Sequence, residues 1–245
     1  MPATPSALGK VPALVLLAAS LGLLLVAGAG PLTRGGVVRW ELAFTIVKWG
    51  FFLGVAAAAG ALILLVLLAV PRFRARPWVP VVALCVALAA AAPPLIILGR
   101  AESAPPIHDI TTDTADPPAF VGLLEERRRS PNGFTYGGEA IAEQQRKAYG
   151  DIKPLVMKVP PREATQRAID AARSLGWEVV SSDAASGRVE ATDTTMWFGF
   201  KDDVIVRVRA EGEGSRVDVR SVSRVGGSDL GANAARIRSF LAKLA

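Results

Sequence analysis

Cysteine and histidine are almost absent from this sequence. The 245 residues include one cysteine, Cys85, and one histidine, His108. A single cysteine excludes an intrachain disulfide and any multi-cysteine metal cluster, and a single histidine excludes zinc sites that need two. The sequence therefore predicts neither a disulfide framework nor a common type of zinc centre.

Acidic residues are nearly missing from residues 1–99, which carry one acid, Glu41, and seven basic residues. This imbalance accounts for the whole net charge of +6, because the basic and acidic groups of residues 100–245 cancel. A nucleic-acid-binding protein should carry its positive charge on a folded polar domain, so we predict no nucleic-acid partner. Basic residues beside apolar runs indicate membrane topology instead.

The whole sequence is 51% hydrophobic, with a mean hydropathy of +0.36. Long apolar runs dominate its first part. Three runs lack any charged residue, at about 11–30, 49–70 and 77–99. A helix of about 20 residues crosses the ~30 Å hydrocarbon core of a bilayer. We therefore expect a membrane domain over residues 1–100, with three spans in contact with lipid.

Two of the runs have features of their own. Lys10 before the first run and Ala27-Gly28-Ala29 near its end also fit a cleaved signal peptide, although the run is longer than usual for one. In the third run, Pro93 and Pro94 should kink or end the helix.

The side of the membrane follows from the short loops. With three spans, Lys10 shares a side with Arg72, Arg74 and Arg76, and a short arginine-rich loop stays in the cytoplasm. This predicts a multi-pass protein of the inner (plasma) membrane whose C-terminal domain lies outside the cytoplasm. No acidic or histidine side chain interrupts the spans, so they indicate anchoring rather than ion transport.

Residues 101–150 have the composition of a Pro-rich linker, with paired prolines and a charge run at 125–129. His108, Asp109, Asp113 and Asp116 lie close together in it and could form a hard-cation site. Their spacing does not match a calcium loop, and no glycine provides the turn. We therefore favour a solvated structural segment and expect no metal and no cofactor.

Residues 151–245 have the pattern of a small α+β domain. Expected strands cover 155–159, 177–181, 188–194, 204–210 and 216–225, and expected helices cover 162–176 and 231–244. The order β-α-β-β-β-β-α, with hairpins between the later strands, predicts an antiparallel sheet backed by two helices.

The last hairpin can be read in register because Gly212-Glu213 suits a two-residue type II′ turn. Val204 then lies opposite Ser221 on a face that packs against the helices, and Asp203 lies diagonal to Arg220 and Arg224 on the other face. We expect Asp202 and Asp203 to meet the arginines at one end of the sheet. This arrangement fits an ion-pair network, and alternatively an anion-binding patch.

No nucleophile–base pair stands out, so the catalytic residues are unknown and we expect no enzyme. Ser221 and Ser223 have no histidine nearby in sequence, and His108 would have to fold back from the linker. The glycine-rich segment 226–231 opens a helix, where Ser228 or Asp229 as N-cap competes with an anion-binding role.

The segments 196–204 and 219–237 carry a family resemblance. Their Phe-x-Asp-Asp and Arg-Ser-x-Ser-Arg-x-Gly-x-Ser-Asp-x-Gly-x-Asn patterns resemble the domain of unknown function 1499 family. The segments 105–110 and 149–155 resemble its membrane-anchored branch, and the similarity covers about residues 105–244. Many members have Asn-Cys near the domain start, whereas Gly133 follows Asn132 here. The resemblance implies the domain but no activity.

Two functional hypotheses follow. The first is a binding or structural module of the cell envelope, with an envelope protein, lipid or small anion as partner. The second is an envelope hydrolase or metal-dependent enzyme that combines His108 with the aspartates and arginines of the sheet. The candidate ligand-binding or structural cluster comprises His108, Asp109, Asp202, Asp203, Arg220, Ser221, Ser223, Arg224, Asp229 and Asn233.

Overall fold

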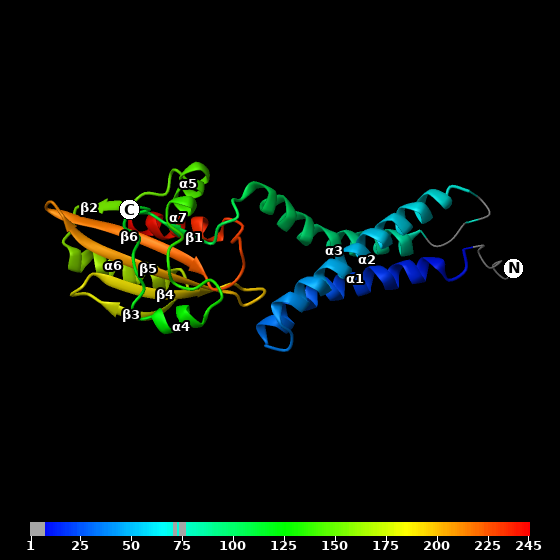
Figure 1. The fold of residues 1–245 in the computed structure, drawn as a ribbon. Coiled ribbons are helices and arrows are strands. Elements are labelled where there is room, and N and C mark those ends of the chain that lie inside the picture. Colours follow the sequence, from blue (N-terminus) through cyan, green and yellow to red (C-terminus); the bar gives the residue numbers. More distant parts are fainter. Residues whose placement is uncertain (1–7, 71–72, 74–76) are drawn as a thin grey trace. The chain divides into compact units, whose positions relative to one another are not determined.

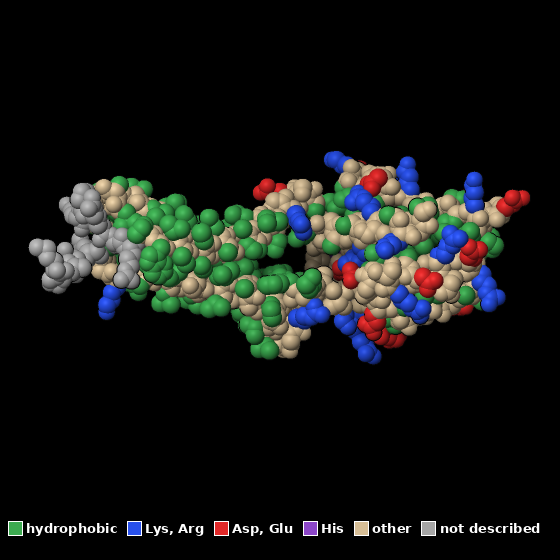
Figure 2. Space-filling model, turned by 180° about the vertical axis from the view of Figure 1, so that it is seen from behind, with side chains coloured by type: hydrophobic (Ala, Val, Ile, Leu, Met, Phe, Trp, Pro, Cys, Tyr) green, Lys and Arg blue, Asp and Glu red, His purple; other side chains and the backbone are tan. Residues whose placement is uncertain are grey.

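The computed structural model describes residues 8–70, 73 and 77–245. The chain divides into two compact units (Figure 1). One contains residues up to 99 together with Met196–Gly199, and the other contains Arg100–Thr195 and Phe200–Ala245. Figure 2 shows hydrophobic side chains covering the helices of the first unit, whereas charged side chains gather on the second.

The first unit contains three long apolar helices, α1 (Val11–Arg34), α2 (Trp40–Leu67) and α3 (Trp78–Ser103). Each is long and apolar enough to cross a membrane, which confirms three candidate spans. Helix α2 begins nine residues before the expected span and therefore includes Lys48. The three arginines used to predict the orientation, Arg72, Arg74 and Arg76, lie outside the described residues.

Glycines bring α1 and α2 together. A Cβ atom built on Gly22 would lie 3.0 Å from the carbonyl oxygen of Gly50 and 3.1 Å from the backbone nitrogen of Gly54. Only glycine permits this close approach, which is typical of packing between membrane helices.

Helix α3 continues through Pro93 and Pro94 to Ser103. The sequence predicted that these prolines kink or end the helix, and the second alternative is therefore wrong. Each proline removes one backbone donor, and membrane helices tolerate this loss when the freed carbonyl groups are satisfied locally.

The second unit is built on a six-stranded sheet of order β1-β6-β5-β4-β3, with β2 also paired to β6. All of its pairs are antiparallel. Its strands are β1 (Asp109–Thr111), β2 (Leu155–Met157), β3 (Glu178–Asp183), β4 (Arg188–Thr194), β5 (Lys201–Glu211) and β6 (Gly214–Ser223).

Four helices accompany the sheet: α4 (Leu124–Arg129), α5 (Glu139–Ala148), α6 (Pro161–Ser174) and α7 (Ala232–Leu244). The α+β class and the antiparallel sheet are confirmed. The composition of residues 101–150 predicts a Pro-rich linker, but β1, α4 and α5 form there.

The last hairpin has the expected register. Val204 pairs with Ser221, Val206 with Val219, and the loop is limited to Gly212 and Glu213 because Glu211 pairs with Gly214. Gly212 has φ +59°, which the first position of a type II′ turn requires.

The main core lies between the sheet and helices α6 and α7. Valines 204, 206 and 219 pack there with alanines of α6, and the ring of Trp177 stacks on Phe240 with 5.2 Å between centroids. The opposite face of the sheet carries the buried charged residues Glu190, Asp203 and Arg220 and is called the polar face here. Residues 112–135 lie over it and are called the covering segment.

Candidate functional site

Asp202 and Asp203 lie on opposite faces of the sheet, because neighbouring side chains alternate along a strand. Asp202 forms an ion pair with Arg236 of α7, whereas Asp203 forms ion pairs with Arg224 and Arg127 on the polar face. The expected single cluster of both aspartates with the arginines is therefore wrong. Two separate networks occupy this end of the sheet.

Asp203 is the centre of the polar-face network and has no exposed surface. Arg224 donates to both of its carboxylate oxygens, from Nε at 2.9 Å and from Nη2 at 2.8 Å. The Thr192 hydroxyl donates to Oδ1 at 2.9 Å, and Arg127 Nη1 approaches Oδ2 at 3.4 Å. Two guanidinium groups thus share one buried carboxylate.

Arg220 is not the second partner of Asp203, contrary to the sequence analysis. Its Nε and Nη2 donate to the two oxygens of Asp109 at 2.9 and 2.7 Å, and it also donates to the carbonyls of Pro118 and Phe134. The guanidinium lies 5.5 Å from the Phe120 ring centroid. Arg220 therefore ties three points of residues 109–135 to β6.

The segment that covers the polar face is also held by the buried carboxylate of Glu190. The Glu190 carboxylate accepts backbone hydrogen bonds from Val121, Gly122 and Leu123 at 2.8–2.9 Å. Phe120 and Leu123 form a small apolar cluster with Ile205 and Val222. The segment is therefore packed on the domain and is not a solvated linker.

Asn132 supplies another point of attachment. Its backbone nitrogen donates to the carbonyl of Arg224, and its side-chain amide donates to the carbonyls of Ser223 and Gly226. Atoms of Asn132 make all of these contacts, and Gly133 makes none of them.

The helix-facing network joins β4, β5 and α7 through Arg236. Its Nη2 donates to Asp202 at 2.6 Å and its Nε donates to Asp193 at 2.8 Å. Its Nη1 donates to the Ser221 hydroxyl and to the Asn233 side-chain oxygen. Arg236 belongs to the resembling pattern, but the sequence analysis did not include it among the site residues.

The two serines of β6 take part in the same network. Ser221 Oγ donates to Asn233 Oδ1 at 2.6 Å, and the Asn233 amide donates to Ser223 Oγ and to the carbonyl of His108, both at 3.0 Å. The partner of the Ser221 hydroxyl proton is thus an amide oxygen, which is a poor general base. His108 contributes its backbone to this network.

Asp229 satisfies the first turn of α7. Its carboxylate accepts from the backbone nitrogens of Gly231 at 2.9 Å and Asn233 at 2.7 Å. The N-cap residue of α7 is Gly231, rather than Ser228 or Asp229 as the sequence suggested. Burial raises the pKa of Asp229 despite these hydrogen bonds. The aspartate, rather than an external anion, therefore occupies the helix N-terminus.

The acids of residues 101–150 pair with arginines. Asp113 accepts from Arg216 at 2.8 Å, and Asp116 accepts from Arg209 at 3.0 Å. The positive charge of Arg207, and to a smaller extent the hydrogen bond from Arg209, lower the pKa of Asp116. Within the described part of the chain, no group of three His, Cys, Asp or Glu side chains could hold a metal ion.

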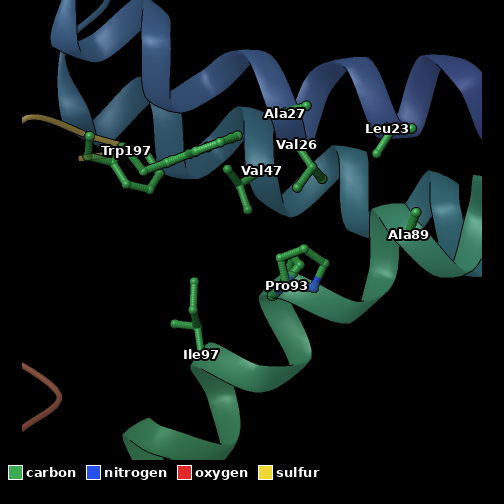
Figure 3. Close-up of a pocket in the computed structure, with 10 residues that line it drawn as sticks. Leu23, Val26, Ala27, Val47, Ala89, Pro93, Ile97 and Trp197 are labelled. Carbon is green, nitrogen blue, oxygen red and sulfur yellow. The ribbon is translucent and has the colours of Figure 1, made fainter. Parts of the chain in front are cut away.

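Each unit also contains a pocket. In the domain, an open pocket of about 260 Å³ lies beside Asp193, Arg236 and Ser239. In the helical unit, an apolar pocket of about 410 Å³ is lined by residues of α1, α2 and α3 and by Trp197 and Phe198. Leu23, Val47 and Ile97 face it (Figure 3). The first pocket has charged walls, and the second suits only apolar groups.

These features define a class, a membrane protein with three candidate spanning helices and an α+β domain closed by buried ion-pair networks. Comparison with protein families places it further. The chain belongs to the family described as protein of unknown function (DUF1499), whose model matches residues 109–244. The match begins at β1, so it includes the segment that covers the polar face. No curated protein matches the chain.

Proposed function

We propose that the chain anchors a rigid binding or structural module in the inner (plasma) membrane and presents it outside the cytoplasm. The observation that carries this proposal is the mutual pairing of the family-pattern residues. Asp203 with Arg224 and Asp202 with Arg236 form ion pairs, and both carboxylates are buried, with Asp203 fully enclosed and Asp202 4% exposed. Because these charged side chains pair with one another, they hold the fold of the module rigid, which suits a binding or structural role.

A polar pocket in the module offers room for a small partner. The pocket beside Arg236 and Asp193 is lined on its exposed side by Ser239. A small anion or a lipid headgroup fits its size, and Arg236 contributes positive charge at its wall. The hydrolase hypothesis has less support, because Ser221 contacts Asn233 and Arg236 instead of a general base.

Native mass spectrometry of the full chain, released from lipid nanodiscs, tests the binding role. Inorganic phosphate and phosphatidylglycerol are the probes. We expect a bound-ligand mass with one of them, and we expect Ser239→Trp to remove it by filling the pocket. Ser186→Trp, at the exposed turn between β3 and β4, should retain the bound-ligand mass. Absence of both adducts, together with hydrolysis of an ester substrate, would favour the enzyme instead.

The location of the domain needs its own experiment. A phosphatase reporter that is active only after export is fused after Ala245, and a fluorescent reporter that is active only in the cytoplasm is the control. We expect phosphatase activity, because Lys10 and the arginines at 72, 74 and 76 favour the cytoplasmic side. Fluorescence with an inactive phosphatase would reverse the orientation.

A further inference from the structure

The loop between β4 and β5 is the most apolar exposed segment of the domain sequence. It reads Thr195-Met196-Trp197-Phe198-Gly199-Phe200, and 86% of Met196 and 49% of Trp197 are exposed. The other large hydrophobic residues exposed after residue 103 are isolated in sequence, namely Val121, Phe134, Val156 and Val180. Isolated exposed residues are ordinary, whereas Met196 and Trp197 are adjacent, and Phe198 and Phe200 beside them are half-buried. Such an apolar patch indicates a binding surface.

The base of this loop is rigid. The Thr195 nitrogen donates to the Phe200 carbonyl at 2.8 Å, and the Phe200 nitrogen donates back to the Thr195 hydroxyl at 2.9 Å. Gly199 has φ +71°, which glycine adopts without strain. These bonds hold Met196, Trp197 and Phe198 beyond the end of the sheet.

The connection to the membrane helices leaves from the same end of the sheet. Asp109, the first residue of β1, pairs with Val222, and Val222 pairs with Asp203 near the start of β5. Only the residues from 104 to 108 separate α3 from β1. Fully extended, this connection spans at most about 20 Å, so β1 begins within about 20 Å of the end of α3.

We propose that residues 196–200 insert into the interfacial layer of the bilayer and form a second attachment of the domain. Tryptophan and phenylalanine side chains favour this layer, where apolar chains meet polar headgroups. The inference rests on α1 to α3 lying in the bilayer and is independent of the side on which the domain lies.

Site-specific fluorescence in nanodiscs tests this insertion with the full chain. Cys85→Ala removes the only native thiol, and Met196→Cys then carries an environment-sensitive dye. The matched control places the same dye at Glu213→Cys, an exposed turn residue at the other end of the sheet. Brominated lipids quench dyes in the bilayer, and iodide quenches dyes in water.

We expect blue-shifted emission at position 196, strong quenching by brominated lipid and weak quenching by iodide. Position 213 should show the reverse. Adding Trp197→Ser and Phe198→Ser should shift position 196 toward the behaviour of position 213, with an unchanged circular dichroism spectrum as the folding control. Equal iodide quenching at both positions would overturn the proposal. Protection from both quenchers at position 196 would also overturn it, because the loop would then be packed against protein.

Discussion

Arg127 and Asp203 form an ion pair, with 3.4 Å between Nη1 and Oδ2, in which neither side chain has any exposed surface. Burial lowers the pKa of Arg127, and the charge of Asp203 opposes this effect. The arginine also donates to the carbonyls of Val222 and Gly133. The pair therefore links the covering segment to the sheet through buried charges.

The first prediction concerns Asp203→Asn. Losing this carboxylate leaves Arg127 and Arg224 uncompensated at a buried position, so unfolding free energy should fall by about 3–5 kcal/mol. Urea denaturation of the full chain in detergent, followed by circular dichroism, measures the loss.

The matched control for Asp203→Asn is Glu163→Gln, whose partner Arg167 forms an exposed ion pair on α6. That change should cost at most about 0.5 kcal/mol. Equal losses in the two variants would mean that water reaches Asp203 in solution.

The second prediction concerns Tyr136, whose hydroxyl is buried without a hydrogen-bond partner among the described residues. Tyr136→Phe removes the unsatisfied group and keeps the ring that contacts Arg220. Stability should therefore rise by about 1 kcal/mol at neutral pH. A loss of stability in the same urea titration would show that a water molecule satisfies the hydroxyl.

The same tyrosine predicts a pH dependence. Burial raises the pKa of Tyr136 from 10.0 to about 12, so the unfolded chain loses this proton first as pH rises. The native state then binds more protons, and stability falls with pH between about 10 and 12. Subtracting the Tyr136→Phe profile from the wild-type profile should isolate this slope. Parallel profiles would contradict the shift.

The hairpin register was predictable from the sequence, whereas the covering segment was not. Alternating valines and the Gly212 turn determine which residues face each other, and this correctly placed Asp203 beside Arg224. The same alternation separates Asp202 from Asp203, a consequence that the sequence analysis overlooked. Periodicity carries information only where strands are regular.

Irregular segments lack such a signal. Arg127 belongs to a run of five charged residues and has the appearance of a solvated residue, yet it is buried. The available indication was the spacing of Leu123 and Arg127, four residues apart on one side of the short helix α4. Leu123 packs into the apolar cluster of Phe120, Ile205 and Val222, and the Arg127 side chain is buried on the same side. Arg220 similarly pairs with Asp109, which lies 111 residues away in the sequence, so no local pattern indicates this contact.

The third prediction concerns Glu190→Gln, which removes the charge that holds three backbone N–H groups of the covering segment. We expect a loss of about 1.5–3 kcal/mol, in the range for hydrogen bonds to charged groups. Limited proteolysis should also become faster within residues 112–135. Glu178→Gln, at an exposed position of β3, is the control and should leave the cleavage pattern unchanged. Identical patterns in both variants would show that Phe120 and Leu123 suffice to hold the segment.

The last prediction concerns the contact between α1 and α2. A Cβ atom on Gly50 would lie 2.9 Å from the Gly22 carbonyl oxygen and 2.9 Å from Leu25 Cβ, so Gly50→Ile cannot fit without separating the helices. Gly28→Ile is the matched control, because no described atom lies within 4 Å of its Cβ position. Ala18 of α1 and Ala58 of α2 both pack against a cluster formed by Ala19, Ala57 and Ala87. Cysteines at these two positions report the helix contact by disulfide cross-linking when Cys85 is replaced by alanine. Cross-linking should be lost with Gly50→Ile and retained with Gly28→Ile, since only the first substitution forces the backbones apart. Retention in both would mean that α1 and α2 meet along a different face in the membrane.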